Sequence, residues 1–241
     1  QHDAIVLCGG AEQARDLPIP GRELEGIYQA MQFLPQQNLA NRGHKQDPAK
    51  QISAKGKRVV ILGGGDTGSD CLGTSNRQGA VSVKQFELMP EPPKERSKDN
   101  PWPQWAFIKR TSTSHEEGVE QFYAVMTKKF SGENGKVKKL HAVKLKFGPK
   151  DPATGRSAME EIPGSEFELE CELVLLAMGF VGPVKNGMIE ELGVALDERV
   201  DIARRVLADY RNVEVLGFDS LLMDFMRKQG ASIILRGLRA V

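Results

Sequence analysis

The chain has 241 residues, and its 33 lysine and arginine residues nearly balance its 32 aspartate and glutamate residues, leaving a formal net charge of +1. A charge this small provides no basic field for nucleic acid, so we expect no nucleic-acid partner. The longest apolar runs, such as Leu173–Phe180, are far too short to cross a bilayer, so we expect no membrane anchor and a cytoplasmic protein. The three cysteines lie far apart without a C-x-x-C pair, which argues against a metal site and favours buried, reduced thiols.

The first predicted element is a short buried strand, Asp3–Cys8, which runs directly into Gly9 and Gly10. A proline-containing turn separates it from a predicted helix over Ile27–Asn41, and residues 43–57 are polar and typical of a loop or linker. Because a strand begins at the third residue and no initiator methionine precedes it, we expect the chain to begin inside a domain.

An apolar strand over Arg58–Leu62 leads into a G-x-G-x-x-G motif and then into a helix-compatible stretch, Thr67–Gln78. A second strand is predicted over Ser82–Leu88, which gives a βαβ unit of about 30 residues. In such a unit the phosphates of a dinucleotide sit on the unpaired N–H groups and the positive dipole end of the helix. Because glycine-rich turns are common, a purely structural turn remains the alternative. The predicted cofactor-binding residues of this loop are Gly63, Gly64, Gly65, Asp66, Thr67 and Gly68.

Each glycine of the motif has a predicted task. Gly63 permits the tight turn, Gly65 lets the backbone approach a pyrophosphate, and Gly68 lets the helix pack closely on the strand.

Glu87 lies at the end of the second predicted strand, about 20 positions after Gly68. An acidic residue at this position can bond the ribose 2′-hydroxyl and repel the 2′-phosphate of NADPH, which favours NADH. Arg77, Lys94 and Arg96 lie nearby in the sequence and keep NADPH open. The structural alternative is that Glu87 is a solvated residue at a strand end.

The remaining chain continues the alternation of strands and helices. Residues 90–103 are rich in Pro, Lys and Glu and are typical of a loop, whereas residues 128–147 alternate around Asn134-Gly135 and predict a hairpin. Another strand is predicted over Phe167–Leu176. The pattern predicts an α/β fold. No residue stands out as a catalytic acid or base, which suits hydride transfer because the cofactor supplies that chemistry.

The segment Asn-Pro-Trp-Pro-Gln-Trp at 100–105 is specific, since few other proteins combine it with the G-G-G-D-T-G of the glycine loop. Together with several further stretches, it makes residues 3 to about 196 resemble the small (β) subunit of glutamate synthase. The matching stretches are Asp3–Gly10 with Leu17–Gly21, Val59–Ser75, Gln85–Pro93, Asp99–Trp105, Glu116–Val119 and Leu175–Phe180.

This resemblance implies an electron-input module, in which NADH or NADPH reduces FAD and iron–sulfur clusters carry electrons to a large subunit that makes glutamate. It implies a Rossmann-like nicotinamide-binding domain inserted in a partial FAD-binding domain, with Gly9, Gly10 and Gly179 near the flavin in the complete protein. The corresponding boundaries are 1–55 for a partial FAD-domain segment and linker, 56–165 for the nicotinamide-binding domain, 166–196 for the return to the FAD domain, and 197–241 for a short α/β segment at the C-terminal end.

The sequence departs from that family at both ends. It lacks the cysteine-rich region that holds the clusters, the first FAD glycine motif and the last flavin-binding segment, so we expect weak FAD binding by this chain. From about residue 196, the stretches Leu196–Arg204, Leu221–Phe225 and Arg236–Val241 instead resemble the middle of phosphopantetheine adenylyltransferase, whose catalytic T-x-G-H segment is absent here. By that resemblance, the substrate and ATP contacts are Met223, Arg236, Gly237 and Arg239.

The leading hypothesis is therefore an oxidoreductase module of the glutamate synthase type, present as a fragment or a chimera. The alternatives are a nucleotidyltransferase fragment of coenzyme A biosynthesis and a non-catalytic nucleotide-binding scaffold.

Overall fold

The computed structural model describes residues 11–45, 47–103, 106–150 and 157–191. The chain divides into two compact units, 1–183 and 184–241. The second unit is described over 184–191 and contains α4 (Met188–Glu191). The other described elements belong to the first unit.

Some predicted features lie outside the described residues. They are the strand Asp3–Cys8, Gly9, Gly10, Trp105, and the adenylyltransferase-like segment with Met223, Arg236, Gly237 and Arg239.

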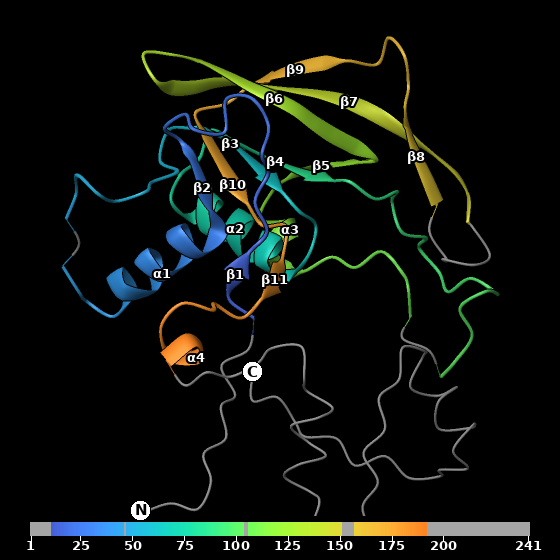
Figure 1. The fold of residues 1–241 in the computed structure, drawn as a ribbon, viewed down its shortest axis with the longest axis horizontal. Coiled ribbons are helices and arrows are strands. Elements are labelled where there is room, and N and C mark those ends of the chain that lie inside the picture. The colour runs from blue at the N-terminus through green and yellow to red at the C-terminus, as the bar shows by residue number, and fades with distance from the viewer. Residues whose placement is uncertain (1–10, 46, 104–105, 151–156, 192–241) are drawn as a thin grey trace, which may run out of the picture. The chain divides into compact units, whose positions relative to one another are not determined.

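A five-stranded parallel sheet forms the centre of the first unit, in the order β2–β10–β3–β4–β5 (Figure 1). Helices cover one of its faces, and an antiparallel sheet lies against the other. The strands are β2 (Ile27–Gln29), β3 (Arg58–Leu62), β4 (Ser82–Glu87), β5 (Glu120–Tyr123) and β10 (Leu173–Leu176). The helices are α1 (Ala30–Asn41), α2 (Asp66–Arg77) and the short α3 (Thr113–Glu116).

The antiparallel sheet has the order β6–β7–β8, and β9 also pairs with β7. Its strands are β6 (Val125–Glu133), β7 (Lys136–Lys150), β8 (Ser157–Glu161) and β9 (Phe167–Glu170). A separate two-stranded ribbon joins β1 (Gln13–Ala14) to β11 (Phe180–Gly182).

Side-chain alternation along β3 explains why the parallel sheet is covered on both faces. Val59 and Ile61 belong to the cluster that packs against the helices, whereas Val60 and Leu62 belong to the cluster shared with the antiparallel sheet. All four are at most 5% exposed. A strand buried on both faces appears in the sequence as a continuous apolar run, and this one does.

The βαβ unit and the hairpin confirm the sequence predictions. Strand β3 has the predicted bounds, and α2 begins and ends one residue before the predicted helix. The hairpin between β6 and β7 turns at Asn134 and Gly135, which have φ of 50° and 75°. Positive φ at both central residues is the backbone of the tight turn that Asn-Gly favours.

The helix predicted over Ile27–Asn41 begins three residues late. Residues 27–29 form β2, which pairs in parallel with β10, because buried Ile27 completes the sheet edge. Helix α1 starts at Ala30, where the backbone N–H of Gln29 donates to Gln32 Oε1 at 2.9 Å. This is the reciprocal bond of a capping box.

The single strand predicted over Phe167–Leu176 is two strands in two different sheets. Strand β9 pairs with β7, whereas β10 lies between β2 and β3. The burial pattern changes at Cys171, from alternating in β9 to continuously buried in β10. The change from a half-exposed to a fully buried strand was visible in the sequence, and the prediction missed it.

The parallel sheet extends beyond the predicted nicotinamide-binding domain, 56–165. Its edge strand β2 comes from the predicted FAD-domain segment, and β10 comes from the predicted return segment. The predicted boundaries at 55 and 165 therefore divide one sheet.

Candidate functional site

Gly63 makes the turn from β3 into the glycine loop. Its φ is 124°, and its N–H donates to the carbonyl oxygen of Phe86 at 2.8 Å. A Cβ at this position would lie 2.1 Å from the carbonyl oxygen of Ala177. Both the conformation and the contact require glycine, which confirms the predicted tight turn.

The other two glycines of the motif differ in their surroundings. A Cβ on Gly68 would lie 2.3 Å from the carbonyl oxygen of Gly63, so α2 packs against the loop as closely as predicted. A Cβ on Gly65 would meet no atom within 4 Å, and its φ is an ordinary −83°. Neither a steric contact nor the backbone conformation therefore requires glycine at position 65, and the open space is where a ligand can approach the backbone.

The first turn of α2 faces solvent. Gly64, Gly65 and Asp66 are exposed, and no side chain caps the helix. An uncapped N-terminus of a 12-residue helix leaves N–H donors and a positive dipole end for an anion. Asp66 adds a negative charge in this turn, which favours the helix but opposes an anionic ligand.

Glu87 lies at the end of β4 directly beside the loop, as predicted. The N–H of Gly64 donates to Glu87 Oε2 at 2.8 Å, and the N–H of Met89 donates to Oε1 at 3.0 Å. The carboxylate is therefore held in place by two backbone donors. A carboxylate has about four acceptor positions, so capacity remains for a ribose hydroxyl. The contact with ribose stays a prediction.

Three basic residues are candidate partners for a 2′-phosphate, and one of them, Arg77, does not lie near the glycine loop. It is in the last turn of α2, at the end away from the loop, and forms an ion pair with Glu117. Lys94 and Arg96 belong to the loop after β4, where Arg96 Nη1 donates to the carbonyl oxygen of Asn100 at 3.0 Å.

Gly179, predicted to lie near a flavin, follows β10 and has φ of 80°. It lines a small hollow together with Thr67 from the start of α2 and Met31 from the start of α1. The structure thus brings Gly179 to the same end of the sheet as the glycine loop, because parallel strands present their carboxyl ends at one edge.

Gln85, in the middle of β4, was missed by the sequence analysis. It is 1% exposed and lies under the glycine loop, where its Nε2 donates to the carbonyl oxygen of Gly63 at 3.0 Å. Because β4 mixes polar and apolar residues, nothing in its sequence marks Gln85 as the buried polar residue.

The two described cysteines are free and buried. Burial raises the pKa of the Cys71 and Cys171 thiols to about 12, so both stay protonated and poorly nucleophilic near neutral pH. Within the described ranges, no cluster of three or more potential metal ligands occurs. None of the helices formed there is long and apolar enough to span a membrane.

The chain is similar in sequence to glutamate synthases. The sequence is 50% identical over 205 residues to the small chain of glutamate synthase [NADPH] from Mycobacterium tuberculosis, covering 84% of this chain but only 41% of that protein. It is 44% identical over 190 residues to glutamate synthase [NADH] from Saccharomyces cerevisiae, covering 76% of this chain and 9% of that protein. The chain therefore spans less than half the length of these relatives.

A solved structure has the same fold. The oxidoreductase FprA from Mycobacterium tuberculosis superposes with a TM-score of 0.56 at 17% identity, covering 77% of this chain and 52% of FprA. The predicted α/β fold with a parallel sheet is thereby confirmed.

The family model for pyridine nucleotide-disulphide oxidoreductases matches residues 1–211. The match continues past the predicted boundary near residue 196, and the comparisons give the adenylyltransferase alternative no support. Because the model covers most of the 241 residues, the chain belongs to the pyridine nucleotide-disulphide oxidoreductase family.

Proposed function

We propose that this chain is the nicotinamide-binding part of an electron-input oxidoreductase of the glutamate synthase type. The observation that carries the proposal is the uncapped N-terminus of α2, with open space at Gly65 and the fixed carboxylate of Glu87 beside it. The pyrophosphate would lie against the N–H groups of this turn, and the ribose would lie against Glu87.

We propose NADH as the preferred cofactor. Glu87 is anchored by two backbone donors, so it cannot swing away easily from an incoming 2′-phosphate. A like charge held this close costs several kcal/mol of binding free energy. The relatives include both an NADPH enzyme and an NADH enzyme by name, so the choice rests on Glu87.

FAD would accept the hydride in the complete protein and supply the redox chemistry. The described residue that bears on it is Gly179, whose backbone lies exposed at the sheet edge beside the glycine loop. The dinucleotide has more support than FAD, because the uncapped start of α2 and the Glu87 carboxylate both lie beside the glycine loop.

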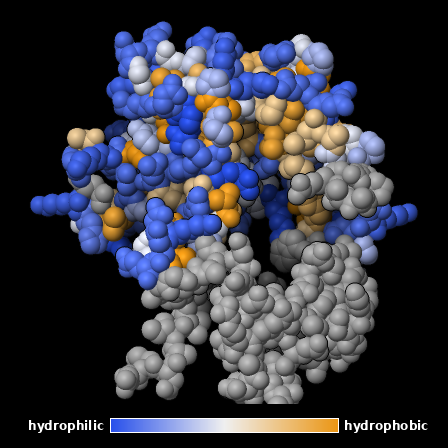
Figure 2. Space-filling view, in the orientation of Figure 1, coloured by the Kyte–Doolittle hydropathy of each residue, from blue (hydrophilic) through white to orange (hydrophobic). Residues whose placement is uncertain are grey.

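Exposed apolar side chains support the idea that the chain works within a larger protein. Trp102 is 82% exposed and Phe107 is 60% exposed. Figure 2 shows a mostly hydrophilic face on which apolar residues gather toward one side. A partner would cover exposed apolar side chains of this size. The partners we propose are the rest of the polypeptide and a glutamate synthase large subunit, in the cytoplasm.

The test is calorimetric titration of the chain with NADH and, separately, with NADPH. We expect NADH to bind more tightly by at least about tenfold, because like charges repel at Glu87. In a Glu87→Ser variant the preference should disappear. Glu91→Gln is the matched control, since Glu91 is an exposed acid four residues away that pairs with Lys109 instead of the loop.

If neither nucleotide binds, the proposed function is wrong and the scaffold alternative is favoured. If NADPH binds more tightly than NADH, the proposed role of Glu87 is wrong. Flavin absorbance of the purified chain separates a module that also holds FAD from one that holds only the dinucleotide.

A further inference from the structure

Gln85 occupies a position where the fold otherwise uses apolar side chains. In β4 it lies on the same side as Val83, which packs in the helix-side cluster with residues of β3 and β10. Gln85 is 1% exposed. Burying an amide among apolar groups is costly unless its polar atoms are paired, so its presence needs a compensating task.

Both ends of the Gln85 amide are paired. Its Nε2 donates to the carbonyl oxygen of Gly63 at 3.0 Å, and its Oε1 accepts from Gln121 Nε2 at 3.0 Å. Gln121 is the direct register partner of Gln85 on β5. A chain of two amides thus runs from the edge strand of the sheet to the first residue of the glycine loop.

The bond to Gly63 and the bond made by Glu87 act on the same peptide group. The carbonyl of Gly63 and the N–H of Gly64 belong to one planar, trans peptide unit and point in opposite directions. Gln85 holds the carbonyl, and Glu87 Oε2 accepts from the N–H at 2.8 Å. Residues 85 and 87 are two apart on one strand, so both side chains leave β4 on the same side.

We propose that Gln85 and Glu87 together clamp the Gly63–Gly64 peptide, and that Gln85 is a positioning residue for nucleotide binding. Fixing this peptide sets the direction in which the following N–H groups, from Gly65 onward, leave the turn. Gln85 acts only through the loop and does not touch the nucleotide. The inference rests on the proposed function for its effect on binding, but the clamp itself does not.

The first test compares NADH affinity in Gln85→Leu and Ser75→Ala variants. Leucine suits the apolar surroundings and removes both amide bonds. Ser75 is the matched control, because it is the other buried polar residue among those described, and its Oγ donates to the Cys71 carbonyl oxygen at 2.7 Å, away from the loop. We expect NADH to bind roughly tenfold more weakly to Gln85→Leu, because this variant loses a hydrogen bond that aligns the glycine loop. The affinity of Ser75→Ala for NADH should equal that of the wild-type chain.

The second test is hydrogen exchange over residues 63–68, which needs no ligand. The Gly64 amide should exchange roughly tenfold faster in Gln85→Leu than in the wild-type chain, and at the wild-type rate in Ser75→Ala. A Gln85→Leu chain that keeps wild-type exchange and NADH affinity would overturn the inference. A wild-type chain with a protected Gly64 amide but no NADH binding would instead overturn the proposed function and leave the clamp standing.

Discussion

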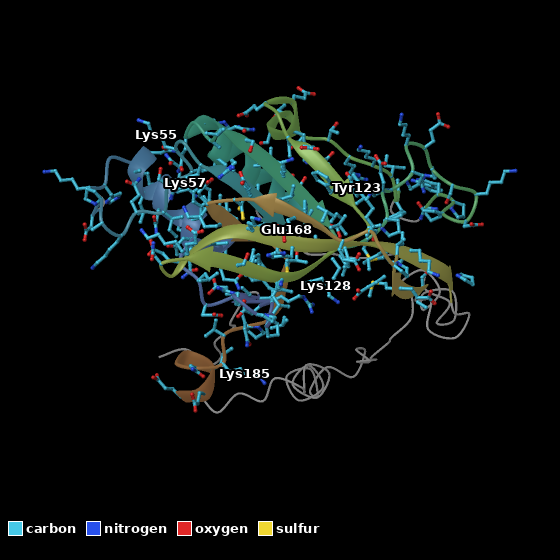
Figure 3. The ribbon with its side chains drawn as sticks, turned by 90° about the horizontal axis from the view of Figure 1, so that it is seen from above. Lys55, Lys57, Tyr123, Lys128, Glu168 and Lys185 are labelled. Carbon is cyan, nitrogen blue, oxygen red and sulfur yellow. The ribbon has the colours of Figure 1, made fainter. Side chains whose placement is uncertain are left out.

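The carboxyl edge of the parallel sheet and the outer face of the antiparallel sheet use their residues in opposite ways. At the edge, backbone groups and glycines form the candidate site, and one carboxylate and one buried amide hold them. The outer face of the other sheet is rich in charged side chains, including Lys128 and Glu168 (Figure 3). The proposed binding site thus lies where glycines leave the backbone exposed.

The outer face even contains a hydrogen-bonded line that resembles a hydrolase triad. Ser131 Oγ lies 2.7 Å from His141 Nε2, and His141 Nδ1 lies 3.0 Å from Glu168 Oε1. Glu168 also pairs with Lys139 at 2.7 Å, and it faces solvent. These residues are cross-strand neighbours on a solvated sheet face, which is a common way to stabilise strand pairing.

The largest expected effect comes from adding one methyl group at the turn. Gly63→Ala places a Cβ 2.1 Å from the Ala177 carbonyl oxygen in a backbone conformation that alanine rarely adopts. We expect a loss of about 4 kcal/mol in the free energy of unfolding and no NADH binding. Denaturant titration measures the first effect and calorimetry the second.

Gly65→Ala is the control for that variant. Since no atom lies within 4 Å of its Cβ and its φ is ordinary, we expect only the loss of a favourable N-cap residue, about 1 kcal/mol or less, together with weakened NADH binding. If both variants lose stability equally, the distinction between a structural and a ligand-facing glycine fails.

The second prediction concerns the core that the two sheets share. Leu140 of β7 is fully buried in the cluster that also contains Val60 and Leu176 of the parallel sheet. Leu140→Ala should lower the free energy of unfolding by about 3 kcal/mol. Leu39→Ala on α1, where the side chain is 41% exposed, should have a much smaller effect. Separate unfolding of the two sheets, seen as two denaturation transitions, would contradict a common core.

The βαβ unit and the hairpin were predictable because their signals are local. An apolar run before glycines sets β3 and its turn, and Asn134-Gly135 sets the hairpin. The clamp on Gly63 was not predictable, because it depends on β3, β4 and β5 lying side by side. For the same reason, sequence reasoning placed Glu87 beside the loop but could not show that backbone donors already hold its carboxylate.

The third prediction tests the ion pair between Arg58 and Glu172, which lies in the connection from β9 to β10. Arg58 of β3 pairs with Glu172, whose Oε2 also accepts from the Arg58 backbone N–H at 2.8 Å. The hydrogen bond from the Arg58 side chain lowers the pKa of the Glu172 carboxyl. The stabilisation is thus complete above the carboxyl's unfolded-state pKa and is lost as pH falls through the lower folded-state value.

Glu172→Gln should therefore cost about 1 kcal/mol of unfolding free energy at pH 7, a figure reduced for partial solvent screening. The gap between variant and wild type should close as the pH is lowered through the acid range. Glu170→Gln is the comparison, because Glu170 is more exposed and pairs with the Arg58 side chain without the bond from the Arg58 backbone N–H, so its effect should be smaller. If the difference in unfolding free energy between Glu172→Gln and the wild type stays constant as the pH is lowered, the charge of Glu172 does not contribute to stability.

The smallest expected effect is also the sharpest test of the contrast between the two surfaces. His141→Ala should change stability by less than about 1 kcal/mol and leave NADH affinity unchanged, because His141 follows Leu140 on β7, and Leu140 is the residue that faces the core shared with the parallel sheet. Ser131 should not react with a fluorophosphonate probe, since the base beside it contacts a carboxylate that Lys139 already holds. If Ser131 is labelled in the wild-type chain but not in His141→Ala, the hydrogen bonds from Ser131 to His141 and from His141 to Glu168 are sufficient to activate a hydroxyl on an exposed sheet face. Absence of labelling would show that a reactive site also needs what the loop edge has, namely backbone donors directed at one point.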